Sequence, residues 1–227
     1  TVSASAQIRG GTGGLRPPTD QQANTNEQAR TVQTGTAQVL FPFSSAPQTV
    51  TYEVRNGKAI FEGDIVLGSV DSAGRILPRP ARPAEERAHD GYGTTSSPLT
   101  VINDSGARWP DGVIPYEAPD PAIFGAANAG TIQTAINTLN AATNLTLRVR
   151  NGEPNFVRFR ATTDNACGSS PIGMQQGQAN TIELNVGNCS LGGIQHEILH
   201  SAGAFHEQAR SDRDSFVTIL TQNIEAN

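Results

Sequence analysis

Three histidines and a glutamate near the end of the chain have the spacing of a metal site with its own base. His196 and His200 are four residues apart, so a helix would place both imidazoles on one face. Glu197 follows the first histidine and could act on a metal-bound water. Gly203 permits a turn out of the helix that can bring His206 round as the third ligand. Three nitrogens plus one open position are typical of a catalytic zinc.

The alternative for these histidines is that they are ordinary residues of a helix core. A short His-Glu-x-x-His match arises by chance, but the longer pattern fixes five residues at set offsets in a chain with four histidines. The spacing therefore favours the zinc site. The fourth histidine, His89, lies in a Pro- and Glu-rich stretch and is expected to be a solvated linker residue.

The residues after the third histidine carry a family resemblance. Residues 206–219 read HEQARSDRDSFVTI. They resemble the signature of the astacin family of secreted metalloendopeptidases, HExxHxxGxxHExxRxDRD followed by a short apolar strand. Upstream, residues 109–116 (WPDGVIPY) look like the first strand of the mature astacin domain. Serralysins and matrixins share the shorter zinc pattern but lack the equivalents of Glu207 and of the Arg-x-Asp-Arg-Asp run.

The resemblance covers about residues 100–227 and implies an α+β fold of the zincin and metzincin type. Such a domain has a mixed twisted sheet and two long helices, and here it would be the N-terminal catalytic subdomain. The apolar pattern agrees, with strands expected at 112–117, 145–150, 156–161 and 181–186. A helix between the first two would bury a stripe formed by Ile132, Ile136 and Leu139.

The mechanism implied by the resemblance uses the zinc ion and Glu197 together. The ion would activate a water and polarise the scissile carbonyl, while Glu197 would take the proton and pass it to the departing amine. In related proteases the strand before the zinc helix lies at the sheet edge and pairs with an extended substrate. The residues expected to do this are Thr181, Ile182, Glu183, Leu184 and Asn185.

A β-hairpin is expected upstream of the catalytic domain. Residues 50–54 alternate in polarity, Asn56-Gly57 is a tight-turn signal, and residues 59–61 resume the apolar pattern. The hairpin leads into Phe61-Glu62-Gly63-Asp64, which resembles the FxGD motif of astacin propeptides, whose aspartate occupies the open zinc position. Asp64 is then the latency switch. Taken alone, Asp64 is better explained as a hairpin-end residue that accepts backbone hydrogen bonds.

The chain is therefore expected to have three regions. Residues 1–36 form a flexible leader with almost no large apolar side chains, and residues 37–99 form a mostly extended propeptide with the inhibitory hairpin and a linker. Residues 100–227 form the catalytic part, with maturation near Thr100 by an activating protease. In astacins the new amino terminus pairs with the glutamate after the third histidine, here Glu207. A surface glutamate at the helix exit is the alternative for Glu207.

Cys167 and Cys189 match in position one of the two disulfides usual in astacins. Two buried free thiols are the alternative. A disulfide would favour a secreted protein, and if the protein is exported, its signal sequence is expected to have been removed already. Charged residues are 16% of the chain, the net charge is −5 and Lys58 is the single lysine. This composition argues against nucleic acid and anionic membranes as partners and leaves protein or peptide substrates.

Astacins place a methionine beneath the metal and a tyrosine as an additional zinc ligand, both downstream of the zinc motif. The single methionine, Met174, lies upstream of it. The chain is therefore interpreted as the N-terminal part of a longer polypeptide, with its own C-terminal portion as a potential separate partner. Two functions stay open: a latent zinc endopeptidase precursor, or a non-catalytic zinc-binding fragment that acts as a binding or inhibitory module.

Overall fold

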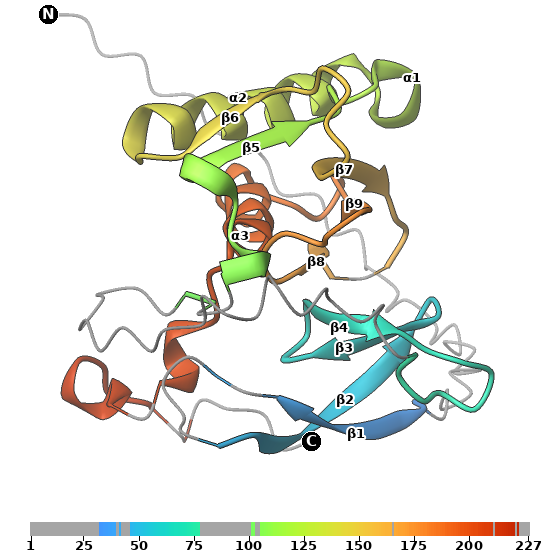
Figure 1. The fold of residues 1–227 in the computed structure, drawn as a ribbon, viewed down its shortest axis with the longest axis vertical. Coiled ribbons are helices and arrows are strands. Elements are labelled where there is room, and N and C mark those ends of the chain that lie inside the picture. Colours follow the sequence, from blue (N-terminus) through green and yellow to red (C-terminus); the bar gives the residue numbers. More distant parts are fainter. Residues whose placement is uncertain are drawn as a thin grey trace, which may run out of the picture. The chain divides into compact units, whose positions relative to one another are not determined.

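The computed structural model describes residues 32–39, 41, 46–77, 101–102, 105–164, 166–210, 212–220 and 222 (Figure 1). All of them belong to one unit of the chain, Val32–Asn227. Residues 1–31, most of the predicted linker and the maturation position near Thr100 lie outside the described residues. The predictions made for those segments therefore stay predictions.

Nine strands form a mixed sheet across the described residues, in the order β1-β2-β3-β4-β8-β9-β7-β5-β6. The first four strands pair antiparallel with their neighbours in the chain, whereas β5, β6, β7 and β9 are parallel. β8 runs antiparallel to β9 and parallel to β4, so it joins the two sets. The strands are β1 (Thr34–Val39), β2 (Gln48–Arg55), β3 (Lys58–Phe61), β4 (Ile65–Ser69), β5 (Val113–Tyr116), β6 (Thr146–Val149), β7 (Phe156–Ala161), β8 (Gly168–Pro171) and β9 (Ala179–Leu184).

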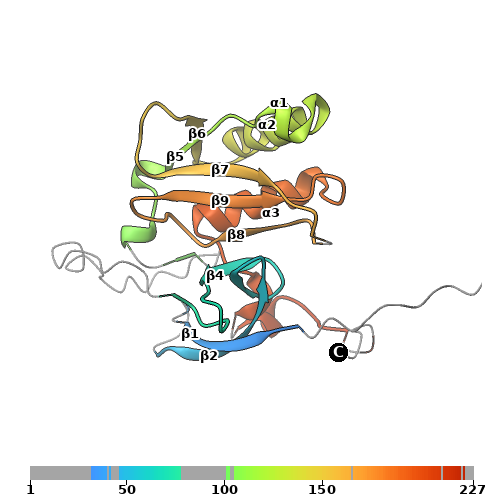
Figure 2. The same ribbon diagram turned by 90° about the vertical axis from the view of Figure 1, so that its right-hand side faces the viewer.

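Two long helices accompany this sheet, which confirms the α+β prediction. α2 (Ala126–Ala142) packs against α3 (Leu191–Ala202), and α3 also contacts β8 and β9 (Figure 2). The predicted stripe of α2 is buried in one apolar core with two residues of α3, a set formed by Ile132, Ile136, Leu139, Ile194 and Ile198. The short helices are α1 (Pro121–Phe124), η2 (Ser105–Ala107), η3 (Pro110–Gly112), η4 (Glu207–Ala209) and η5 (Arg213–Ser215).

The strands of the catalytic part fall close to their predicted positions. The strand expected at 156–161 is β7, and those at 112–117 and 145–150 are β5 and β6, each one residue shorter at both ends. The strand expected at 181–186 is β9, which begins and ends two residues earlier. β8 was not predicted from the sequence.

The predicted edge position of the strand before the zinc helix is wrong. β9 lies between β7 and β8 and is paired on both sides (Figure 2). Ile182 and Leu184 are fully buried, and Asn185 lies just beyond the end of the strand. On this side of the sheet the outermost strand of the catalytic part is instead β8, because the next strand, β4, lies upstream of the catalytic part in the sequence. Thr181 and Glu183, like the other three predicted residues, therefore do not form the sheet edge.

The predicted hairpin is formed by β2 and β3. Asn56 and Gly57 both have positive φ, 49° and 72°, the geometry of a two-residue type I′ turn. The boundary of the leader at residue 36 is contradicted, because residues 34–36 belong to β1. This strand has few apolar side chains, but its backbone pairs with β2 along its whole length. The Tyr52 ring lies directly over Gly35, where any Cβ would overlap it.

The hairpin strands contact the catalytic part by polar and apolar groups. The Lys58 ammonium lies 2.6 Å from the Glu183 carboxylate, and the side chains are about one-fifth exposed. The Asn56 amide donates to both carboxylate oxygens of Asp164 at 3.1 and 3.0 Å. A small apolar cluster joins the upstream strands to the catalytic part; it is centred on Phe41, Ile65, Ile172 and Phe205. The docked hairpin is thus held at several points.

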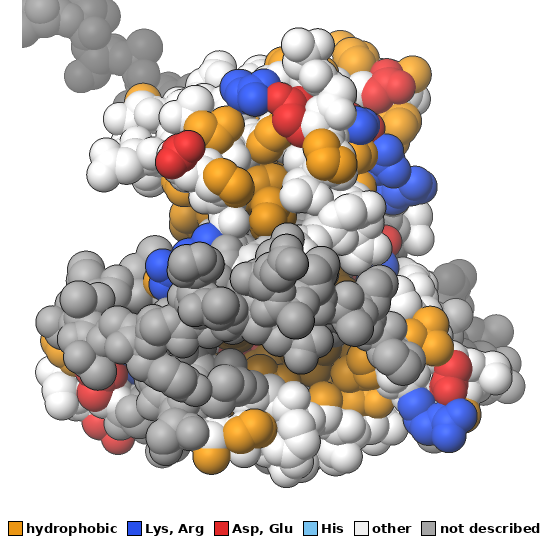
Figure 3. All heavy atoms as spheres, viewed as in Figure 1, with side chains coloured by type: hydrophobic (Ala, Val, Ile, Leu, Met, Phe, Trp, Pro, Cys, Tyr) orange, Lys and Arg blue, Asp and Glu red, His pale blue; other side chains and the backbone are white. Residues whose placement is uncertain are grey.

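On the outer surface, basic side chains of β6, β7 and the loop after β6 are paired with acidic ones. Arg150 and Arg158 both contact Glu117, at 3.1 and 2.6 Å, and Arg148 contacts Glu153. Figure 3 shows basic and acidic side chains close together on the face that it presents. No helix in the described part of the chain has the length and apolar character needed to cross a membrane.

Candidate zinc site

The helix α3 carries the first two histidines, and its ends are fixed by local interactions. The Ser190 side chain accepts a hydrogen bond from the Gly193 amide at 3.0 Å, which caps the amino end. Gly203 ends the helix in the left-handed region, with φ of 116°. A Cβ there would lie 2.9 Å from Ile102, so glycine also permits a close approach. The chain then turns back toward the helix and reaches His206.

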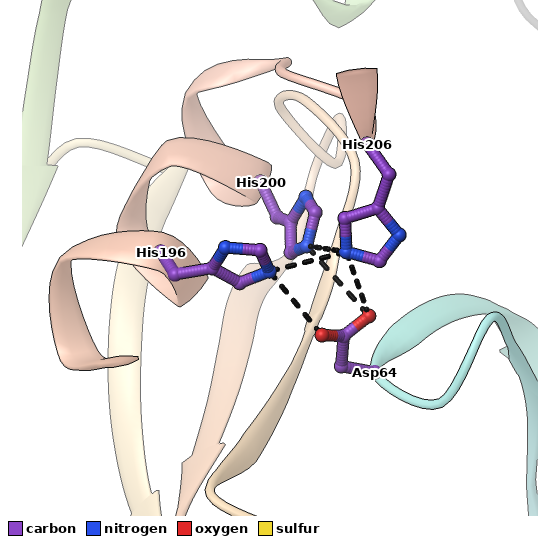
Figure 4. Close-up of side chains that lie close together, drawn as sticks. All are labelled: Asp64, His196, His200 and His206. Carbon is purple, nitrogen blue, oxygen red and sulfur yellow. Dashed lines mark hydrogen bonds and ion pairs between the residues drawn. The ribbon is translucent and has the colours of Figure 1, made fainter. Parts of the chain in front are cut away.

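The three imidazoles converge, as the sequence predicts (Figure 4). His206 Nε2 lies 3.1 Å from His196 Nε2 and 3.1 Å from His200 Nε2. Zinc–nitrogen bonds of about 2.0–2.1 Å in a tetrahedral site put ligand nitrogens roughly 3.3 Å apart. The observed separations are close to this value. The three nitrogens are therefore placed to share one divalent ion.

Asp64 completes the group from the hairpin side. Its Oδ2 lies 3.2 Å from His196 Nε2, and its Oδ1 lies 3.2 Å from His206 Nε2 and 3.7 Å from His200 Nε2 (Figure 4). The ligand atoms of all four residues lie within 4.8 Å of one another. Oδ1 is buried and accepts no well-directed hydrogen bond from the described residues. A carboxylate oxygen that faces nitrogens without bonding to them fits a set of donors arranged around an ion.

The turn between β3 and β4 positions Asp64. Glu62 and Gly63 both have positive φ, 50° and 95°, which turns the chain sharply. The Arg55 guanidinium donates to the Gly63 carbonyl. On the other side, the Ser170 amide of β8 donates to the Asp64 carbonyl at 2.9 Å. The backbone on both sides of Asp64 is therefore held, and its side chain projects at the histidines.

Burial and pairing shift the pKa values of Asp64, His200 and His206. Burial of Asp64 favours its neutral form, but close pairing with His196 and His206 holds its pKa well below the usual range. Burial lowers the pKa of His200 to about 4. Close pairing with Asp64 and a hydrogen bond with Glu62 raise the pKa of His206 to about 9. A zinc ion must compete with the proton on His206, because only neutral imidazole binds metal.

Glu197 lies in the same site, on the turn of α3 that carries His196. It is 2% exposed, and no donor among the described residues reaches its Oε2. Burial, aided by the negative charge of Asp64, raises the pKa of Glu197 to about 8. A Cβ on Gly168 would lie 3.0 Å from Glu197 Cγ, so β8 passes directly beside this carboxyl group. Glu197 is thus placed between the histidines and the outermost catalytic strand.

The second nitrogens of two histidines have partners that sequence reasoning did not assign. His200 Nδ1 donates to the Ala204 carbonyl at 2.8 Å, which leaves Nε2 free to bind metal. His206 Nδ1 lies 2.8 Å from Glu62 Oε2. Glu62 stands in the FxGD motif, but that motif leaves its position unspecified. The sequence therefore offers no signal for this contact.

Glu207 directly follows the third histidine and has a basic partner. Glu207 Oε2 is 3.4 Å from the Arg210 guanidinium, which also forms a two-bond pair with Asp212 at 2.7 and 2.8 Å. In this form of the chain Glu207 therefore has a cationic partner other than a new amino terminus, and its maturation role stays a prediction.

The predicted disulfide between Cys167 and Cys189 is confirmed, with Cα atoms 4.5 Å apart.

The helix, the returning third histidine and the mixed sheet together define a zinc-binding protein of the zincin class. A family model described as astacin, a family of peptidases, matches residues 101–227, more than half of the chain. The chain belongs to the astacin family, whose members are zinc metalloendopeptidases. Zinc is accordingly its cofactor, and the four convergent side chains fit that ion.

Curated relatives resemble the chain over part of their length. Embryonic protein UVS.2 of Xenopus laevis is 36% identical over 129 residues, which cover 55% of this chain and 24% of the relative. High choriolytic enzyme 2 of Oryzias latipes is 38% identical over 49% of this chain and 38% of the relative. Zinc metalloproteinase nas-4 of Caenorhabditis elegans is 27% identical over 71% of this chain and 48% of the relative. The chain thus spans between a quarter and a half of these relatives.

The nas-4 match covers 161 residues, more than residues 101–227 contain, so part of it lies outside the residues that the family model matches. Among solved structures, high choriolytic enzyme 1, a hatching enzyme zinc-protease from Oryzias latipes, is 32% identical. That match has a TM-score of 0.46 and covers 56% of this chain and 64% of the other.

Proposed function

We propose that the chain is the latent precursor of a secreted zinc endopeptidase, in which Asp64 occupies the zinc position that catalysis needs open. The observation that carries this proposal is the convergence of Asp64 with His196, His200 and His206. An anionic oxygen suits Zn²⁺ and, as a fourth ligand, closes the coordination shell. The resemblance of residues 61–64 to the FxGD motif of astacin propeptides supports a precursor of this kind.

The chemistry proposed for the mature site follows from the placement of Glu197. When bound, zinc would polarise the scissile carbonyl and make a water nucleophilic near neutral pH. Glu197 would receive the proton released by this water and deliver it to the leaving amine. Its burial beside the histidines and the raised pKa, about 8, suit a group that must both hold and release a proton.

The hairpin would block substrate as well as the metal. An extended peptide can bind a protease by adding a strand to an exposed sheet edge. In the precursor this edge, β8, is paired with β4 through Ile65 with Ser170 and Val66 with Pro171. In the uncut chain a substrate would reach β8 only when β4 detaches transiently, and loss of the Asp64 contact with the histidines would make this detachment easier. Since β8 also passes Glu197, a peptide on this edge would have its backbone near the base.

Maturation would require an activating protease that cuts between the hairpin and the catalytic part. After the cut, Glu207 would exchange Arg210 for the new amino terminus. The disulfide supports an extracellular location, where such bonds persist. Protein or peptide substrates follow from the peptidase family, and the C-terminal portion of a longer polypeptide is a further proposed partner.

Zinc content and casein hydrolysis, measured before and after trypsin nicking of residues 69–99, test the proposal. We expect stoichiometric zinc in both samples and hydrolysis only after nicking. Asp64→Ala should raise the activity of the uncut chain, whereas the control Glu53→Ala, at an exposed position of β2, should not. Unchanged latency in Asp64→Ala would rule out the switch. Zinc binding without hydrolysis after any processing would favour the non-catalytic module.

A measurement that does not need turnover separates the two parts of the proposal. With Co²⁺ in place of zinc, added acetohydroxamate should change the visible absorption of Asp64→Ala, because a coordination position is open. The same ligand should leave the spectrum of the unmodified uncut chain unchanged. Equal responses from both chains would mean that Asp64 does not close the site.

A further inference from the structure

The turn between β3 and β4 contributes a second carboxylate, that of Glu62, to the zinc site. Glu62 Oε2 lies 2.8 Å from His206 Nδ1, on the side of the ring opposite to the Nε2 that faces Asp64. The side chains are largely enclosed, with 28% exposure for Glu62 and 7% for His206. The contact joins residues 144 apart in the sequence, so it arises from docking of the hairpin. Asp64 and Glu62 thus hold one imidazole from both edges.

The backbone at Glu62 is unusual for this residue type. Its φ of 50° lies in the left-handed region, where asparagine and aspartate are enriched among residues other than glycine. The other described non-glycine residues with positive φ are Asn56 and Asp111, which fit that preference. Glutamate has no such local advantage. The contact with His206 supplies a reason for a glutamate at this turn, since its longer side chain reaches the ring.

The positive charge of the zinc-loaded site also favours a carboxylate at this position. A Zn²⁺ ion with three neutral imidazoles and the Asp64 carboxylate carries one net positive charge. Glu62 would offset the positive charge of the ion and its four ligands, and buried charge is costly unless it is compensated. Carboxylates that accept the second N–H of a metal-binding histidine fix its tautomer and raise its basicity as a ligand.

We propose that Glu62 is a positioning residue that holds His206 with Nε2 toward the zinc ion and so strengthens zinc binding in the uncut chain. The proposal rests on the zinc ligands proposed above. The support of His200 is different, because the Ala204 carbonyl belongs to the catalytic part itself. When the hairpin leaves, His200 keeps its support and His206 loses its own. The precursor is then the form that binds zinc more firmly, which suits loading of the metal before maturation.

The test compares Zn²⁺ affinities of uncut chains by competition with a chromophoric chelator. Loss of an outer carboxylate partner of a metal ligand typically weakens binding about 10–100-fold, and we expect a loss in this range for Glu62→Gln. Glu53→Gln makes the same change of charge at an exposed site on β2 and should match the unmodified chain. Because glutamine nearly preserves the size of the side chain, circular dichroism of the metal-free variants should show both of them folded under the conditions of the affinity measurement.

A double-mutant cycle assigns the effect to His206. In a His206→Ala background, Glu62→Gln should change zinc affinity by less than about twofold, because its partner is gone. In the Co²⁺-loaded chain, Glu62→Gln should shift the visible absorption bands, which a remote stabilising residue would not do. Full affinity in Glu62→Gln, or an equal loss with and without His206, would overturn the positioning role. Full affinity in His206→Ala would instead overturn the proposed ligand set.

Discussion

Removal of the Cys167–Cys189 disulfide should lower the free energy of unfolding by about 3 kcal/mol. The bond closes a loop between residues 22 apart, and a loop of that length restricts the unfolded chain by about 11 cal/mol/K, or roughly 3 kcal/mol near room temperature. The bond also adjoins the start of α3. Cys189 precedes the capping Ser190, and a Cβ on Gly193 would lie 2.6 Å from Cys167 Sγ.

The assay is urea unfolding of the metal-free chain, followed by circular dichroism, for the double variant Cys167→Ala/Cys189→Ala. With a slope of about 2 kcal/mol/M, the midpoint should fall by about 1.5 M. Reduction of the unmodified chain should reproduce the shift, and reductant should not affect the double variant. A shift that corresponds to less than about 1 kcal/mol would refute the loop-entropy reasoning, since the cross-link would then restrict the unfolded chain far less than its length implies.

Two further substitutions test the local reasoning. Gly203→Ala should destabilise the chain by about 1–2 kcal/mol, because a side chain is forced into the left-handed region against Ile102; an unchanged thermal unfolding midpoint would contradict this. Glu117→Gln tests how stability depends on pH. In the unmodified chain the hydrogen bond from Arg158 outweighs the effect of burial and lowers the pKa of Glu117. The pairing should therefore stabilise the fold above the ordinary pKa of glutamate and lose this effect as the pH falls through the lowered value. The difference in urea midpoint between the two chains should be present at neutral pH and vanish in acid; a difference independent of pH would exclude the pairing as its source.

The parts of the fold with strong local signals were predictable from the sequence. The spacing of the histidines, the Asn56-Gly57 turn and the apolar stripe of α2 each depend on residues close together in the chain. They correspond to α3, the hairpin and the core found in the structure. The boundary at residue 36 failed because β1 has mostly polar and small side chains and is held by backbone pairing with β2, which composition does not reveal.

The features of the site that could not be predicted depend on contacts between segments far apart in the sequence. β8 has the sequence Gly-Ser-Ser-Pro, which lacks the β-branched and aromatic residues typical of strands, so the sequence gives no signal that a further strand lies beside β9. The Glu62–His206 contact joins two segments that meet only when the hairpin docks. By contrast, Asp64 could be assigned because its motif resembles that of a family. No rule of periodicity or turn chemistry would have brought it to the histidines.

The position of Asp64 in the chain has a consequence for release. Asp64 and His196 are 132 residues apart but belong to one uncut polypeptide chain. The carboxylate is therefore present at the histidines at the high effective concentration of a tethered group. A single cut between Leu77 and Val101 would remove the tether. From then on, rebinding would depend on how dilute the freed fragment becomes. Simple dilution after a distant cleavage could therefore uncover the metal without any chemical change at the metal itself.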